Sequence, residues 1–345
     1  MLKYRYKDDK IIFENDFNEN LSPDILEAIS KVSKIHFGNN FNKRVKYFPK
    51  NLKEIIFGNN FNQQLNEIPS GLIYLEFKDD FNQDIKKYPK ELKILKFGKS
   101  FNRILKNLPE TLEKLVLGNS FTNTLENLPN NLKVLIIGES YDRFIEKYPE
   151  NLIFIEFGKN FNQFLNNLPD SLRYLTFNKK SIFNQMVDNL SENITHIKFG
   201  HSFNQYVFKM PKNIKYLEFG DNFNKYVNNL PIGLNIISFG YFFNHQLDML
   251  PNTVTHLSLS RMYNQSLNEL PNSIEVLIIG YSKYQGNFRL IYDSIEFNQK
   301  IQVLPKNLRF LAIHPRYIYL DDLRERFSNI IITTEDYIYF EEFDL

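Results

Sequence analysis

A repeat of 20 residues runs through most of this 345-residue chain and limits what it can fold into. At one phase of the repeat an aromatic residue is followed by a polar one, usually as Phe-Asn, and a proline stands eight positions later in every copy but one. A unit this short cannot bury its own apolar face, so successive copies must stack into a solenoid. The aromatic anchors stand at positions 41, 61, 81, 101, 121, 141, 161, 183, 203, 223, 243, 263 and 297.

Each repeat predicts one short strand. Between the proline and the next anchor, apolar residues alternate, as in Ile55-x-Phe57, which is the pattern of a strand with one buried face. Gly58 follows, and we expect it to permit a bend at the end of the strand. A coil of 20 residues has no room for a full helix beside the strand. The return side is therefore expected to be extended or 3₁₀-like, and the strands are expected to form a parallel sheet.

The anchor phase predicts an aromatic spine with a polar ladder beside it. Stacked coils place each anchor ring on the next one, and the Asn after the anchor falls where its amide can bond the backbone of the neighbouring coil. Asn is also a common turn residue, which would explain part of its abundance without a ladder. Because Asn recurs at one fixed phase, we favour the ladder, and Thr122 and Asp142 are compatible with it.

The composition argues against several partners. With 42 Lys+Arg and 40 Asp+Glu the net charge is +2, too small for the basic field that nucleic-acid binding requires. No apolar stretch is long enough to cross a membrane, so no membrane partner is expected. The absence of cysteine removes disulfides and favours an intracellular, cytoplasmic location, which would be the host cytoplasm for a viral protein.

The sequence also argues against catalysis. The six histidines have no chelating spacing, and no nucleotide-binding, hydrolase or metalloprotease motif occurs. We therefore expect no enzyme activity, no metal and no cofactor.

Two end segments frame the repeats. Residues 1–31 are expected to form an amino-terminal cap with a short helix that starts at Ser22-Pro23-Asp24. Residues 32–313 form the solenoid, with about 13–14 coils by repeat counting. Residues 314–345 are expected to form a carboxyl-terminal cap with a helix over 321–327, a strand over 329–333 and an acidic, aromatic tail.

The candidate binding surface is the outward side of the strands, which we expect to be concave. Several of its side chains are apolar or aromatic where a solvated sheet would carry more Lys, Glu and Thr, although β-propensity alone also favours such residues. The predicted partner-contact residues are Tyr74, Ile94, Val116, Val134, Ile136, Phe154, Tyr174, His196, Tyr216, Ile236, His256 and Val276.

The repeat is interrupted most strongly by an insertion at 281–296. Insertions in solenoids map to loops at one edge, often beside the binding face, but a long surface loop without a function costs little. The aromatic residues Tyr284, Phe288 and Tyr292 are the candidates for partner contact in this loop.

The consensus run Leu-Pro-x-x-Leu-x-x-Leu-x-Phe-Gly-x-x-Phe-Asn-Gln, of which the repeats from Leu128 and from Leu250 are variants, resembles the FNIP repeat, a variant of the leucine-rich repeat. FNIP-repeat proteins occur in social amoebae and in giant viruses of amoebae. The resemblance covers roughly residues 32–313. It implies a leucine-rich-repeat-like horseshoe or arc that acts in protein–protein interaction. Some relatives carry an amino-terminal F-box, but the short segment before residue 32 shows only one short helix, so an F-box is not expected.

Three functions remain open from the sequence. The first is a non-enzymatic scaffold, for example a viral protein acting on a host target, that binds a macromolecular partner on its concave face. The second is a substrate-recognition adaptor for a ubiquitin ligase, which a Skp1-like or cullin-like partner would reveal. The third is a carbohydrate-binding solenoid that uses its Tyr residues. The scaffold is the most economical of the three.

Overall fold

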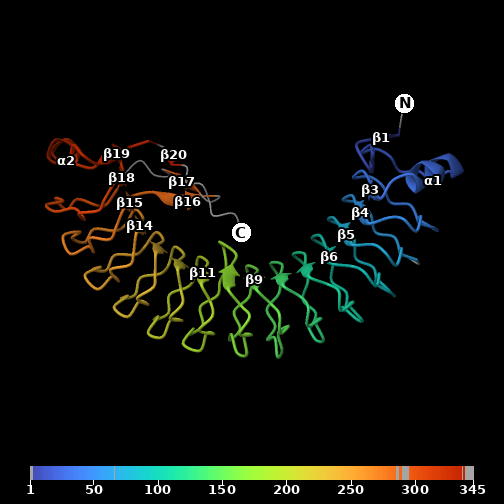
Figure 1. The fold of residues 1–345 in the computed structure, drawn as a ribbon, viewed down its shortest axis with the longest axis horizontal. Coiled ribbons are helices and arrows are strands. Elements are labelled where there is room, and N and C mark those ends of the chain that lie inside the picture. Colours follow the sequence, from blue (N-terminus) through green and yellow to red (C-terminus); the bar gives the residue numbers. More distant parts are fainter. Residues whose placement is uncertain (1–2, 66, 285–286, 290–294, 336, 339–345) are drawn as a thin grey trace. The chain divides into compact units, whose positions relative to one another are not determined.

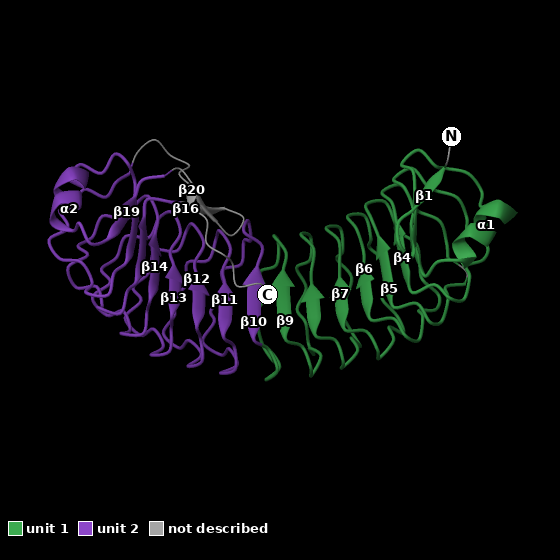
Figure 2. Cartoon of the chain, turned by 45° about the horizontal axis from the view of Figure 1, so that its top comes forward, with its two compact units in different colours: residues 1–172 green, residues 173–345 purple. Residues whose placement is uncertain are grey.

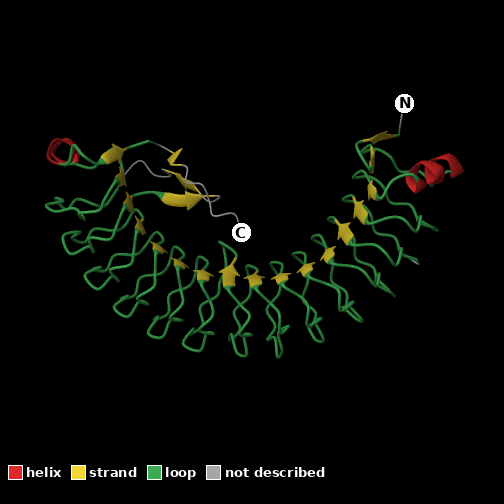
Figure 3. Ribbon diagram, in the orientation of Figure 1, coloured by secondary structure: helices red, strands yellow, loops and turns green. Residues whose placement is uncertain are grey.

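The computed structural model describes residues 3–65, 67–284, 287–289, 295–335, 337 and 338, and for 282–284, 287–289, 337 and 338 it describes the backbone alone. The chain divides into two compact units, Met1–Leu172 and Arg173–Leu345 (Figure 2). In each unit, short strands line one side of a stack of coils, and long loops form the opposite side (Figures 1 and 3). The predicted parallel solenoid is confirmed.

Unit 1 contains eight parallel strands, β2 to β9, and β1 is antiparallel to β2. The register advances by one repeat per strand, so that Ile55 pairs with Leu75 and Leu75 with Leu95. The elements are β1 (Tyr4–Tyr6), β2 (Lys10–Phe13), α1 (Pro23–Ser30), β3 (Lys34–His36), β4 (Glu54–Phe57), β5 (Tyr74–Phe77), β6 (Ile94–Lys96), β7 (Lys114–Val116), β8 (Val134–Ile136) and β9 (Phe154–Phe157).

Unit 2 repeats this pattern with eight parallel strands and adds an antiparallel sheet of β16, β17 and β20. The elements are β10 (Tyr174–Phe177), β11 (His196–Lys198), β12 (Tyr216–Glu218), β13 (Ile236–Ser238), β14 (His256–Leu259), β15 (Val276–Ile279), β16 (Ser282–Tyr284), β17 (Asn287–Arg289), β18 (Phe310–Ile313), α2 (Leu320–Arg326), β19 (Ile331–Thr333) and β20 (Tyr337–Ile338).

The solenoid has more coils than repeat counting predicted, with about 16 turns. The additional strands are β2 and β19, which extend the parallel sheets into the end segments. The sequence carried a signal for the first of them, because Phe17-Asn18 is a further aromatic–Asn pair and the Phe17 ring stacks on Phe41 at 5.7 Å. Helix α1 lies between these two anchors and lengthens their spacing beyond the regular period.

Both predicted end helices are present. Helix α1 starts as expected, with the Ser22 hydroxyl accepting a hydrogen bond from the backbone N–H of Ile25 and Pro23 in the first turn. Its buried residues are Ile25, Ala28 and Ile29. Helix α2 covers most of the predicted range 321–327, and β19 lies within the predicted strand 329–333. The segment boundaries 1–31, 32–313 and 314–345 themselves stay predictions.

The core is a double column of aromatic rings. The anchors stack as expected, with centroid distances of 5.9 Å between Phe41 and Phe61 and 6.1 Å between Phe61 and Phe81. A second column, formed by phenylalanines at the strand ends or one residue beyond them, was not expected; Phe57 and Phe77 stack with ring centroids 5.3 Å apart, and the Phe57 ring lies 3.8 Å from the ring of the anchor Phe61. Where both columns are aromatic, a ring contacts rings within its own coil and in the next coil, which ties the register of the coils to side-chain packing; Leu117 and Ile137 stand in the second column in two coils of unit 1.

The predicted asparagine ladder is present in both units. In this ladder a side-chain oxygen accepts a hydrogen bond from the backbone N–H one coil further on. The N–H of Asn62 donates to Asn42 Oδ1 at 3.0 Å, and the N–H of Asn82 donates to Asn62 Oδ1 at 2.9 Å. Asp142 performs the same role toward Asn162 at 2.9 Å. The same bond recurs in unit 2 from Asn184, Asn204, Asn224, Asn244 and Asn264.

The glycine at the strand end has a second role besides the expected bend, which is present as a turn in which Phe61 N–H donates to Gly58 C=O at 3.4 Å. A Cβ placed on Gly118 would lie 1.6 Å from the carbonyl oxygen of Gly98 in the preceding coil, and one on Gly220 would lie 2.0 Å from that of Gly200. Glycine is thus required for close approach of neighbouring backbones. In one coil of unit 1, Lys78 stands at this position of the repeat, and the coils on either side have glycine there. Glycine is therefore not required in every coil.

The return side is extended with single turns at the prolines, in which Leu72 N–H donates to Pro69 C=O at 3.1 Å and Leu112 N–H to Pro109 C=O at 3.0 Å. Before three of the prolines of unit 1, Asn107, Asn127 and Asn167 adopt positive φ values of 55°, 56° and 60°. Asn tolerates this left-handed conformation better than most residues. Part of the Asn content that the ladder does not use is explained by these turns.

Candidate functional site: the strand faces

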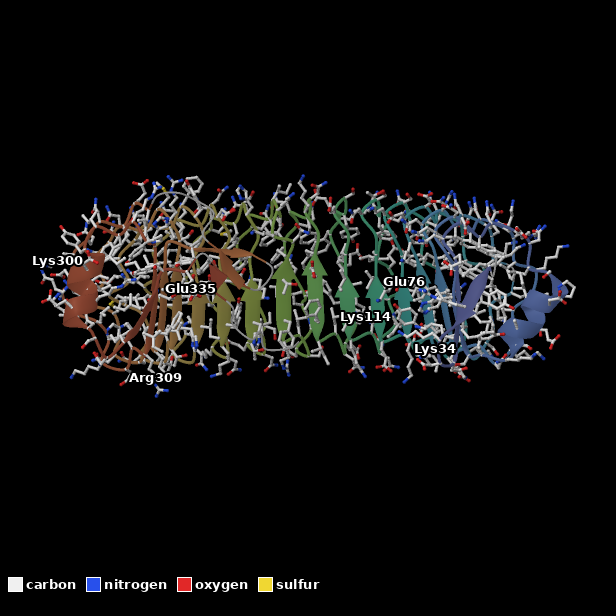
Figure 4. All side chains as sticks on the ribbon, turned by 90° about the horizontal axis from the view of Figure 1, so that it is seen from above. Lys34, Glu76, Lys114, Lys300, Arg309 and Glu335 are labelled. Atoms are coloured by element: carbon white, nitrogen blue, oxygen red, sulfur yellow. The ribbon has the colours of Figure 1, made fainter. Side chains whose placement is uncertain are left out.

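The outward side chains of β3 to β9 form the strand face of unit 1. Figure 4 looks onto the strand faces and labels Lys34, Glu76 and Lys114 on the strands of unit 1. The register places Lys114 between Ile94 and Val134 in one column. In the second column, Val116 and Ile136 are neighbours. The predicted residues Tyr74, Ile94, Val116, Val134, Ile136 and Phe154 are all half-buried on this face.

Charged groups cluster at the amino-terminal part of this face. Glu54 pairs with His36, and Lys96 Nζ lies 3.5 Å from a carboxylate oxygen of Glu76 and 5.1 Å from the centre of the Tyr74 ring. The Tyr74 hydroxyl donates to Glu76. Burial, followed by this bond to Glu76, raises the pKa of Tyr74, so the hydroxyl keeps its proton. Burial opposes the charge on Lys96, but Tyr74 and Glu76 outweigh it and raise the lysine pKa.

The strand face of unit 2, from β10 to β15, carries stacked rings in place of aliphatic residues. The ring centroids of Tyr174 and His196 are 4.6 Å apart, and those of His196 and Tyr216 are 5.8 Å apart. Lys198 Nζ lies 5.4 Å from the centre of the Tyr216 ring, and the Tyr216 hydroxyl donates to Glu218. Three neighbouring strands thus present one column of rings, with a charged pair in the column beside it. Ile236 and His256 continue the first column and are half-buried.

The two histidines of this face share one local geometry. Thr195 Oγ1 lies 2.8 Å from His196 Nδ1 and donates to the carbonyl oxygen of Arg173 at 3.2 Å, and Thr255 relates to His256 and Asn235 in the same way at 2.9 and 3.3 Å. Because the threonine hydroxyl has one proton, a bond to the carbonyl leaves its oxygen to accept from Nδ1–H. This assignment makes Nε2 the acceptor on each ring.

Both imidazoles are held in the neutral form. Burial lowers the pKa of His196, and the charge of Lys198 lowers it further. Burial also lowers the pKa of His256, against the opposing effect of Glu275. A neutral ring keeps Nε2 as a hydrogen-bond acceptor, which a protonated ring would lose.

The end of this strand face is covered by the chain itself. Ile278, Tyr281 and Ala312 form a buried apolar cluster against which Val276 and Phe310 pack, and the Tyr281 hydroxyl donates to the Glu335 carbonyl at 2.9 Å. Val276, predicted to contact a partner, therefore takes part in an internal contact. In the insertion, Tyr284 and Phe288 lie in β16 and β17, whose side chains are not described, and Tyr292 lies outside the described residues.

One set of exposed side chains was missed by reasoning from the strands. Met186, Tyr206 and Tyr226 stand three residues after their anchors, on the segment that leaves the strands, and they are 63%, 46% and 57% exposed. The sequence did mark these residues, because the third position after the anchor is polar in most other repeats. Among the described residues, no group of His, Asp and Glu is arranged to hold a metal ion, and no helix could cross a membrane.

The comparisons with known proteins agree with this architecture. The model of the FNIP Repeat matches residues 41–80, 65–100, 81–120, 101–140, 145–180, 208–242, 226–262 and 243–282, which together make up more than half of the chain. The chain belongs to the FNIP-repeat family. The resemblance seen in the sequence is thus confirmed, and the Phe-Asn anchors and ladder of this FNIP-repeat protein are the residues that carry it.

A solved structure shares the fold. The protein is similar to CroV588, a giant-virus protein described as a novel circular leucine-rich-repeat structure, with 27% identity, a TM-score of 0.51, and coverage of 90% of this chain and 67% of CroV588. It is also similar to YopM from Yersinia enterocolitica, with 18% identity, a TM-score of 0.48, and coverage of 84% of this chain and 65% of YopM. No curated protein matches the FNIP-repeat chain.

Proposed function

We propose that this FNIP-repeat protein is a protein-interaction scaffold whose strand faces bind the partner. The observation that carries the proposal is the chemistry of the outward columns. In unit 1, Val116, Val134 and Ile136 are half-buried neighbours outside the core, and in unit 2 the rings of Tyr174, His196 and Tyr216 are in contact in one column. Solenoid packing uses the inward columns only, so it does not account for these residues.

The two faces suit protein contact better than charge-driven binding. Lys96 and Glu76 satisfy each other, as do the Tyr216 hydroxyl and Glu218, so much of the local charge is already paired. Apolar and aromatic side chains between such pairs resemble the core and rim of a protein interface. Leucine-rich-repeat-like solenoids are typical scaffolds for protein interaction, which supports the same assignment.

The test is affinity purification from the native cell with matched variants of the full chain. Val134→Asp places a charge among the aliphatic residues of the unit 1 strand face, and Tyr216→Asp removes a ring from the column of unit 2. Asn130→Asp is the control, because it adds the same charge at an exposed position in a turn of the loop side. We expect Asn130→Asp to retain the partner and at least one strand-face variant to lose it by about tenfold or more, since central interface residues dominate affinity. Circular dichroism should be the same for all three.

The other outcomes are informative. An unchanged set of captured proteins in both strand-face variants would contradict the proposal. A Skp1-like or cullin-like protein among those captured would favour the ubiquitin-ligase adaptor. Binding on a glycan array without capture of any protein would favour the carbohydrate-binding alternative.

A further inference from the structure

A second surface lies on the flank of unit 2, formed by the segments that follow the strands. We call Met186, Tyr206, Phe208 and Tyr226 the flank row; Phe208 is 59% exposed, and the other three are similarly open. The repeat does not require apolar residues there. The third position after the anchor is polar in the coils that carry Gln64, Asp84, Thr124, Gln246 and Ser266.

The rings of the flank row are already held in place by one another. Tyr206 and Phe208 stack with centroids 4.9 Å apart and an interplanar angle of 8°, and Lys225 Nζ lies 5.1 Å from the centre of the Tyr206 ring. Tyr226 contacts the His245 ring at 4.2 Å. Side chains that are ordered before binding lose little conformational entropy when a partner covers them, which favours their use as interface anchors.

At the centre of the row the charges are of one sign. The two central segments, 203–210 and 223–230, contain Lys209 and Lys225 and no acidic residue. Among the described residues neither lysine has an ion-pair partner. The coils on either side carry Asp188 and Asp248, so the positive charge is confined to the centre of the row. A complementary partner must bring negative charge to this centre.

We propose that the flank row, with Lys209 and Lys225, binds an acidic segment of a partner protein that also carries aromatic or large aliphatic side chains. The apolar side chains of the segment cover Tyr206, Phe208 and Tyr226, and its carboxylates approach the two ammonium groups. The row lies on the segments after the strands, whereas the strand face lies on β10 to β15. The two surfaces can therefore be occupied independently.

A labelled peptide in which Glu and Asp alternate with Phe and Leu tests the inference by fluorescence anisotropy with the full chain. We expect saturable binding that the double variant Tyr206→Ser, Tyr226→Ser weakens about tenfold or more, because exposed aromatic anchors supply the apolar contact. The double variant Lys209→Glu, Lys225→Glu should weaken it as strongly at low salt, and less at high salt.

Two controls separate the surface from its surroundings. Phe164 of unit 1 stands at the same position of its repeat and is 54% exposed. Because it lies outside the flank row, Phe164→Ser should leave the affinity for the peptide unchanged. Tyr216→Asp on the strand face should also leave it unchanged, whatever becomes of the strand-face proposal. The inference is overturned if no saturable binding occurs, if the flank variants bind as well as the natural chain, or if a peptide with Lys in place of each acid binds equally.

Discussion

The strand faces of the two units have the same backbone and different chemistry. Unit 1 presents aliphatic side chains such as Val116 beside the paired charges of Glu76 and Lys96, whereas unit 2 presents the stacked rings of His196 and Tyr216. Behind both faces the interior is the same, with aromatic columns, a ladder of amide side chains and close glycine contacts. The comparison shows that packing fixes the inward phases and leaves the outward phases free to differ.

The largest expected effect tests whether the interior is equally strict in both units. Gly118→Ala in unit 1 and Gly220→Ala in unit 2 each place a Cβ within 2.0 Å of a carbonyl oxygen of the preceding coil. We expect each to lower the free energy of unfolding by about 2–4 kcal/mol, because the backbones must move apart and the aromatic columns with them. Urea unfolding measures both values.

Lys78→Ala is the matched control for these glycines. It changes a side chain at the same phase without adding a Cβ, and Lys78 is exposed, so its effect should stay within about 0.5 kcal/mol. A large loss in one unit and none in the other would show that the interiors are not equivalent.

A smaller effect of opposite sign is expected where tyrosine replaces phenylalanine in the anchor column. The hydroxyls of Tyr141 in unit 1 and Tyr263 in unit 2 are buried and have no hydrogen-bond partner among the described residues, and burial raises the pKa of both. Tyr141→Phe and Tyr263→Phe should each stabilise the protein by about 1 kcal/mol, because an unsatisfied polar group is removed from the core.

Tyr317 provides the contrasting case in the same column. Its hydroxyl donates to the Gln299 carbonyl at 2.8 Å and accepts from the Ile301 N–H at 3.2 Å. Tyr317→Phe should therefore destabilise the protein by about 1 kcal/mol. If thermal unfolding shows that Tyr141→Phe destabilises the protein as Tyr317→Phe does, the Tyr141 hydroxyl has a hydrogen-bond partner, such as a buried water.

The sequence predicted most of the interior because each phase there has one physical task. The anchors, the ladder and the start of α1 all follow from side chains that repeat at a fixed spacing or from a helix-capping pattern. The close backbone contact at Gly58 was not anticipated, since contact between coils depends on how closely their backbones approach, and a single repeat does not reveal that distance. The second ring column was missed for a related reason: Phe57 reads as an ordinary buried strand residue until the strand end is placed beside Phe61.

The candidate surfaces were less predictable. Alternation identified which strand residues face outward, and all twelve predicted residues lie on the strands as outward positions. It did not predict that Val276 would pack against the cluster around Tyr281, because that contact depends on the path of an insertion without a repeat pattern. The flank row was overlooked because its segment has no strand alternation, and only the contrast between coils marks it.

The smallest expected effect sharpens the difference between the two strand faces. Burial lowers the pKa of His196 in the folded chain, with Lys198 as the second cause. Below the unfolded-state pKa of about 6.5, the unfolded chain binds a proton that the folded chain resists, so stability falls as the pH drops from about 6.5 toward the folded pKa. His196→Gln should therefore lose less stability between neutral and mildly acidic pH than the natural chain does. Lys198→Gln should reduce the same loss to a smaller extent, since burial is the larger cause. Amide hydrogen exchange at the two pH values would locate the change, which we expect in β11 and its neighbours in unit 2. If both variants and the natural chain lose the same stability between the two pH values, His196 is not the source of that loss.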